Sequence, residues 1–128
     1  MDFIKDHYMA EKKPPEWEVD KLRTKGKGRT YPYLVPEVKN VGDGTAHNVE
    51  IYGHAISQDG ENPVPSKNKE EIEKVFPGNS ASVKTKIDNN TDAIRVTIDS
   101  DGEDRWQTTI NPDYYEVEDW MEKKLGRM

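Results

Sequence analysis

One segment, from Val38 to Tyr52, restricts the fold of this chain more than any other. It reads Val-Lys-Asn-Val-Gly-Asp-Gly-Thr-Ala-His-Asn-Val-Glu-Ile-Tyr, so an extended stretch ends at Asn40 and a Gly-Asp-Gly turn follows. Glycine and aspartate are residues that tight turns favour. Val49 and Ile51 then alternate with polar or aromatic neighbours, which is the period of a strand with one buried face. The segment predicts two strands joined by a turn.

Similar alternation predicts more strands along the chain. They are expected at Trp17–Leu22, Tyr31–Lys39, Asn48–Ser57, Ala81–Ile87, Ile94–Ile98 and Trp106–Ile110. Glu70–Phe76 fits either a short strand or one helical turn. Pro32 and Pro36 place the second strand at an edge or beside a bulge, because proline has no N–H for a ladder. Pro77-Gly78 fits a type II turn and Asp101-Gly102 a hairpin. The pattern predicts an all-β fold, an immunoglobulin-like antiparallel β-sandwich of about seven strands.

The chain divides into three parts, and its 128 residues suit one domain. Residues 1–15 form an N-terminal extension that ends at Pro14-Pro15, and residues 16–111 form the sandwich. Residues 112–128 are expected to form a short amphipathic C-terminal α-helix that begins at Asn111-Pro112. Its apolar residues recur at helical spacing: Tyr114, Val117, Trp120, Met121 and Leu125.

Composition excludes several classes of function. The net charge of −6 and the pI near 5.1 argue against a nucleic-acid partner, which would require a basic face. The absence of cysteine excludes disulfides, thiolate zinc sites and cysteine nucleophiles. Nothing in the sequence is long and apolar enough to insert into a membrane. The compartment stays open: extracellular or cell-surface if the chain is excised from a longer one, cytoplasmic if Met1 is the native start.

The turn and strand residues resemble those of two families of bacterial immunoglobulin-like domains, the CARDB and FxLYD types. The resemblance rests on these stretches: Glu37-Val38-Lys39-Asn40, Gly42–Ala46, Asn48-Val49-Glu50-Ile51, Asp59-Gly60 and Phe76-Pro77-Gly78-Asn79-Ser80-Ala81. It covers residues 17–110 and departs at Pro36, where glycine is usual, and in the charged stretch around 66–74. It implies a module for adhesion, spacing or ligand contact that is not an enzyme and has no shared catalytic site.

Candidate metal and phosphate sites are few. Asp99, Asp101, Glu103 and Asp104 suggest calcium, but an EF-hand loop starting at Asp99 would need glycine at its sixth position and an acid at its twelfth. A turn with solvated carboxylates is the favoured interpretation. The basic residues at every second position from Lys21 to Arg29 are interpreted as a solvated loop, since two glycines interrupt them. The three histidines lack metal-ligand spacing, so no cofactor and no metal are expected.

The residues that remain as candidates for partner contact are aromatic and aliphatic. Val35 is expected to face outward, together with Tyr33, Tyr52 and Ile56. The apolar stripe of the C-terminal helix, formed by Tyr114, Val117, Trp120, Met121 and Leu125, either packs on its own sandwich or docks on a partner.

Three functions follow from these observations. The first is a non-enzymatic protein-binding or spacer module of a bacterial protein, with a protein partner. The second is a self-assembling structural protein, a homo-oligomer in a phage or surface assembly that uses the C-terminal helix as its joint. The third is a calcium-dependent carbohydrate binder built on the acidic 99–104 hairpin and the 59–69 loop.

Overall fold

The computed structural model of the chain describes residues 14–25, 32–57, 60–61, 68–88, 90–115 and 117–125, with the backbone alone for 60–61 and 123–125. The elements in chain order are β1 (Trp17–Lys25), β2 (Tyr33–Asn40), β3 (Ala46–Ser57), β4 (Gly60–Glu61), β5 (Lys69–Val75), β6 (Ser80–Ser82), β7 (Thr85–Lys86), β8 (Thr91–Asp99), β9 (Trp106–Ile110), the 3-10 helix η1 (Pro112–Tyr115) and α2 (Glu118–Leu125). The ambiguous 70–76 stretch is therefore a strand, β5.

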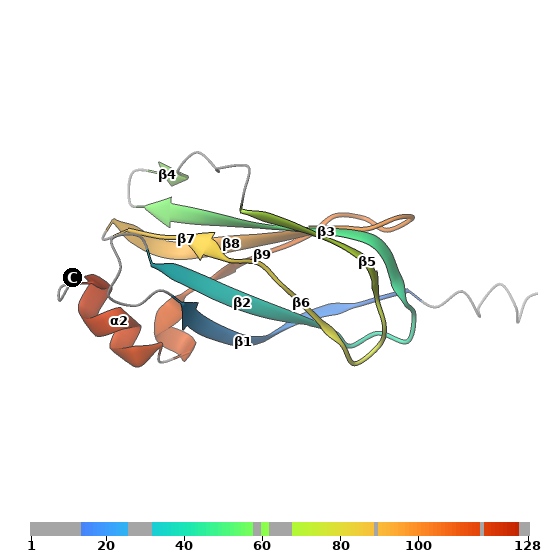
Figure 1. Cartoon of the computed structure of the whole chain (residues 1–128), viewed down its shortest axis with the longest axis horizontal. Coiled ribbons are helices and arrows are strands. Elements are labelled where there is room, and N and C mark those ends of the chain that lie inside the picture. The colour runs from blue at the N-terminus through green and yellow to red at the C-terminus, as the bar shows by residue number, and fades with distance from the viewer. Residues whose placement is uncertain are drawn as a thin grey trace, which may run out of the picture.

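Two antiparallel sheets pack face to face (Figure 1). The smaller has the order β1-β2-β6, with β7 also paired to β2. The larger has the order β4-β3-β8-β9, with β5 also paired to β3. Because β6 and β7 both pair with the same edge of β2, one after the other, they are two halves of one interrupted strand. With the two-residue β4 set aside, seven principal strands remain, and the predicted immunoglobulin-like sandwich with a short C-terminal helix is confirmed. In a constant-type immunoglobulin domain the fourth strand belongs to the sheet of the first two strands, whereas here β5 pairs with β3 in the other sheet.

The core lies between the sheets and follows the predicted alternation. Val38, Val49 and Ile51 are fully buried, as expected. In β8, which pairs with β3 in the same sheet, Ile94, Val96 and Ile98 continue the side of the core formed by Val49 and Ile51, although Thr97 between them is buried as well. Removing this apolar surface from water is the main force that brings the sheets together.

Of the two positions predicted for Pro36, the edge is wrong, because β2 is central in its sheet, but a bulge does lie beside it, in β1 between Val19 and Lys21. Glu37 pairs with Ser82 and Leu34 pairs with Thr85. In this register Pro36 lies opposite the break between β6 and β7. Proline lacks the N–H that a ladder would use there, so the ladder is interrupted on the partner side.

Strand β1 also differs from its interpretation as a loop preceded by a short strand. It extends through Lys25, so Lys21, Arg23 and Lys25 belong to a strand, and Arg23 forms an ion pair with Glu37. A register shift between Val19 and Lys21 explains why Leu22 breaks the apolar alternation. The other two basic residues, Lys27 and Arg29, lie outside the described residues.

The C-terminal segment closes one end of the sandwich, called here the helix end. Val117, Trp120 and Met121 are buried in the same core as the strands. The five residues Glu118–Glu122 have positive φ angles of 43–54°, which is the left-handed region. That region costs an L-residue about 1–2 kcal/mol, and no glycine lies between Asn111 and Leu125 to remove the cost. Within the described residues, no helix is long and apolar enough to cross a membrane.

Candidate functional site

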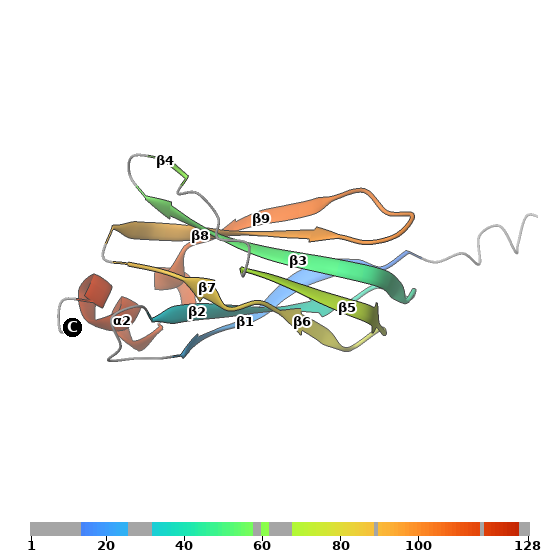
Figure 2. The same ribbon diagram turned by 45° about the horizontal axis from the view of Figure 1, so that its top comes forward.

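Three turns meet at the end of the sandwich opposite the helix, and this end is called the loop end. They are residues 41–45 between β2 and β3, residues 76–79 between β5 and β6, and the 100–105 hairpin between β8 and β9 (Figure 2). Immunoglobulin-type domains bind ligands with turns gathered in this way, because a rigid sandwich holds them in place.

Asn40 holds the first turn in position. It is fully buried, and its side-chain oxygen accepts hydrogen bonds from the backbone N–H groups of Glu16 (3.2 Å) and Gly42 (3.0 Å). Its amide nitrogen donates to the carbonyl oxygens of Gly44 (2.8 Å) and Val75 (3.1 Å). One side chain therefore joins the residue that precedes β1, the 41–45 turn and the end of β5. The sequence marks Asn40 only as the last residue of a strand.

The second turn is bonded to the same residue. The Asn40 N–H donates to the Asn79 carbonyl (2.9 Å), and the Gly78 N–H donates to the Asn40 carbonyl (2.8 Å). The Asn79 N–H closes the turn on the Phe76 carbonyl (2.9 Å), and Gly78 has a φ of 88°. This is the predicted type II turn, with proline and then glycine in the centre.

Two large apolar side chains protrude from these turns. Phe76 is 51% exposed and Val41 is 44% exposed. Each is adjacent to a residue of the hydrogen-bonded network, so its backbone is held while its side chain faces water. Exposed apolar groups on a rigid frame lose little conformational entropy when they bind a partner.

The third turn is connected to the start of β3. The Asp101 N–H donates to the His47 carbonyl (2.9 Å), and the Asn48 side-chain amide donates to the Asp101 carboxylate (2.5 Å). Asn48 itself has a φ of 51°. Arg105 binds both oxygens of Asp99, at 2.9 and 3.0 Å.

These bonds bear on the calcium hypothesis. Two of its four carboxylates, Asp99 and Asp101, already have partners within the hairpin and β3. Across the part of the chain that the structure describes, no group of three or more histidine or carboxylate side chains is placed to hold a metal ion. Most of the 59–69 loop, the other part of the calcium hypothesis, lies outside the described residues.

An acidic depression of about 390 Å³ lies beside the loop end, on the surface of the paired strands β3 and β5. Its lining residues are Asn48, Val49, Glu50, Glu71, Ile72 and Glu73. Glu50 and Glu71 are directly paired across the two strands, which is unfavourable for like charges. Lys69 relieves part of this charge through its ion pair with Glu71 (3.1 Å).

Tyr52 is bound into the same row of side chains. Its hydroxyl donates to Glu50 (2.7 Å), and this hydrogen bond, followed by burial, raises the pKa of Tyr52 above its ordinary value. The Lys69 ammonium lies 5.8 Å from the centre of the Tyr52 ring. The hydrogen bond to Glu71 raises the pKa of Lys69 as well. Tyr52 is thus half-buried in a polar network.

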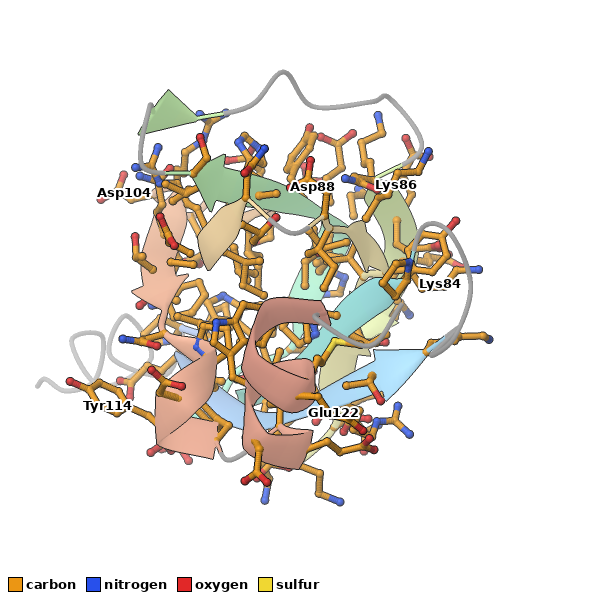
Figure 3. All side chains as sticks on the ribbon, turned by 90° about the vertical axis from the view of Figure 1, so that its left-hand side faces the viewer. Lys84, Lys86, Asp88, Asp104, Tyr114 and Glu122 are labelled. Atoms are coloured by element: carbon orange, nitrogen blue, oxygen red, sulfur yellow. The ribbon has the colours of Figure 1, made fainter. Side chains whose placement is uncertain are left out.

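The structure does not bring the predicted contact residues into one surface. Tyr33 is half-buried at the start of β2, with Lys84 5.4 Å from its ring centre, and Ile56 is half-buried at the far end of β3. Tyr114 is 83% exposed in η1. Figure 3 shows Tyr114 and Lys84 on opposite sides of the molecule. Val35 is covered, at 8% exposure, but it does not belong to the core cluster between the sheets.

The helix residues proposed for partner contact are placed differently again. Val117, Trp120 and Met121 are 5%, 8% and 3% exposed and belong to the chain's own core, so the helix packs on its own sandwich here. The Leu125 side chain lies outside the described residues. A joint made from this helix would have to take those three side chains out of the core.

Phe76 and Val41 were not among the predicted contact residues. The sequence does contain a feature that could have indicated them, because each is a large apolar residue within or next to turn residues. Phe76 directly precedes Pro77-Gly78, and Val41 stands between Asn40 and Gly42. An apolar residue in such a position has no strand face to join.

Comparison with models of known families, with curated proteins and with solved structures finds no match to this chain. The resemblance to CARDB-type and FxLYD-type domains therefore remains a prediction from the turn residues, beside a fold that the structure shows.

Proposed function

We propose that the chain is a non-enzymatic protein-binding module of a bacterial protein, of the CARDB or FxLYD kind, and that it binds its protein partner through the loop end. The observation that carries this proposal is the exposure of Phe76 and Val41 on turns tied to Asn40. Apolar anchors that are already rigid, with polar groups around them, are typical of binding hot spots.

The charge around these anchors indicates the kind of partner. Asp43, Asp101, Glu103 and Asp104 lie in turns of the same end, and the depression on β3 and β5 adds three glutamates. A protein surface with an apolar pocket and basic residues at its rim would complement this end.

A spacer role is compatible with the same geometry. The chain enters β1 at the loop end, and α2, the last element that the structure describes, is at the helix end (Figure 1). Modules with this arrangement form extended rows when they are linked in tandem. Small-angle scattering on two linked copies would test this role, because a spacer gives a maximum dimension close to two domain lengths and a folded-back pair does not.

Site-directed photocrosslinking tests the binding role. A benzophenone amino acid is placed at Phe76, and in a matched control at Lys84, which is also exposed but is not in the loop end. In the cells that naturally produce the chain, irradiation is expected to give a discrete heterologous adduct from position 76 and none from position 84. The same adducts from both positions, or none from 76, would contradict binding through the loop end.

A further inference from the structure

The outer edges of the two sheets differ in how they are protected against pairing with another strand. In the described part of the chain these edges are β1, the β6/β7 strand, the β4 and β5 side of β3, and β9. An edge strand presents unpaired N–H and C=O groups, and natural proteins protect such edges with charge, bulges or short length.

Every edge except β9 carries one of these protections. Strand β1 has a bulge between Val19 and Lys21, and more than half of its residues are charged. Strand β5 is charged at most positions, and β4, β6 and β7 have only two or three residues each. Strand β9, Trp-Gln-Thr-Thr-Ile, has no charge and no proline.

Strand β9 runs along one side of the molecule. Asp104 and Tyr114, which precede and follow β9 in the chain, both lie on that side in Figure 3. Gln107 and Thr109 are exposed along the strand. Thr97 donates a hydrogen bond to Gln107 (3.1 Å), which holds that side chain on the outer face of the sheet.

We infer that β9 is a self-association edge that pairs antiparallel with β9 of a second copy, about a two-fold axis at Thr108. In this register Trp106 lies opposite Ile110 of the other copy, and Gln107 lies opposite Thr109, so apolar meets apolar and amide meets hydroxyl. The two larger sheets then become one continuous sheet.

The same operation on the other long edges is unfavourable. Pairing β5 with itself about Ile72 places Glu71 opposite Glu73, and pairing β1 about its central residue places Lys21 opposite its own copy. The sequence therefore disfavours self-pairing at β1 and β5 and permits it at β9. This inference does not rest on the proposed function, because it uses no residue of the 41–45 or 76–79 turns.

A matched pair of charge variants tests the register. Q107K/T109E places lysine opposite glutamate twice in the dimer, and Q107E/T109E places glutamate opposite glutamate twice. Both variants carry the same T109E change, at the position that pairs with Arg95 within the chain, so this contribution cancels between them. Sedimentation of the native full chain up to its solubility limit is expected to show a dimer. The dimer dissociation constant of Q107K/T109E is expected to be roughly tenfold lower than that of Q107E/T109E. A native chain that is monomeric throughout, or two variants with equal constants, would overturn the inference.

Disulfide trapping gives a second readout, made simple by the absence of native cysteine. Residue 108 meets its own copy at the axis, at a Cα separation of about 4.5–5.5 Å, within the range of a disulfide. Thr108→Cys is expected to oxidise to a covalent dimer, and Thr24→Cys, a half-buried threonine on the β1 edge, to remain monomeric. Equal crosslinking of the two variants would contradict the assignment to β9. A Phe76→Ser chain that still dimerises would separate this edge from the loop end.

Discussion

The two ends of the sandwich are stabilised by different means. At the loop end, Asn40 uses all of its side-chain hydrogen-bonding groups on four backbone partners. The turns around it have the conformations that their own glycine, proline and aspartate residues favour. Toward the helix end, the hydroxyl of the fully buried Thr85 has no hydrogen-bond partner among the residues that the structure describes, and five residues of α2 have left-handed φ angles. Hydrogen bonds of a polar side chain therefore stabilise the loop end. At the helix end, burial of apolar side chains compensates for the unsatisfied Thr85 hydroxyl and the unfavourable φ angles of α2.

The comparison explains why the loop end is the better candidate for binding. A surface that is to hold a partner needs fixed backbone and side chains that are not already used by the core. Phe76 and Val41 meet both conditions, whereas Trp120 and Met121 are used to close the sandwich.

The largest expected effect is at Asn40. Asn40→Ala removes four hydrogen bonds and leaves the Gly42 N–H and the Val75 carbonyl buried without these partners, so we expect a loss of about 3–5 kcal/mol of unfolding free energy. Urea unfolding measures this change. Asn79→Ala, at an exposed position in the neighbouring turn, is the control and is expected to cost less than about 0.5 kcal/mol. Similar losses of unfolding free energy in Asn40→Ala and Asn79→Ala would show that the Asn40 hydrogen bonds are not what stabilises the loop end.

Gly53 tests the packing toward the helix end. A Cβ at this position would overlap the Thr85 hydroxyl, so Gly53→Ala is expected to cost about 1–3 kcal/mol. Thr85→Ala removes that hydroxyl, and the double variant should recover part of the loss. A double-mutant cycle in urea checks the coupling. Costs that simply add would show that the two residues are not in contact.

The handedness of α2 is tested at the exposed Asp119, whose φ is 52°. Glycine adopts this region without cost and alanine does not, so Asp119→Gly is expected to be about 1 kcal/mol more stable than Asp119→Ala. In a right-handed helix the order is reversed by a similar amount. Thermal or urea unfolding of the two variants therefore decides the handedness of the segment, and the reversed order would show that burial does not outweigh backbone preference there.

The smallest expected effect is at Phe76. Because half of its side chain already faces water, Phe76→Ser should change the unfolding free energy by less than about 0.5 kcal/mol. Chemical denaturation beside the native chain measures this. A loss as large as that of a buried residue would assign Phe76 to the core and weaken its role in binding.

Turn chemistry and strand period could be predicted because they depend on neighbours in the chain. Pro77-Gly78 and Asp101-Gly102 adopt the turns expected of them, with positive φ at both glycines. Alternation located most strands, and the phase break at Leu22 was already visible, although its cause, a bulge in β1, was not. The contact residues could not be predicted in the same way, because exposure depends on what the other sheet covers.

The sequence by itself therefore determined the class of fold, the turns and the core positions, because periodicity and turn preference act over a few residues. The tertiary structure decided the remaining features. It placed β5 in the sheet of β3, set Pro36 opposite the break between β6 and β7, and buried the helix stripe in the core. It also joined the 41–45 and 76–79 turns through Asn40 and bound the 100–105 hairpin to the start of β3, leaving Phe76 and Val41 exposed. Each of these outcomes depends on segments far apart in the chain, whose pairing is governed by total burial and not by any local pattern.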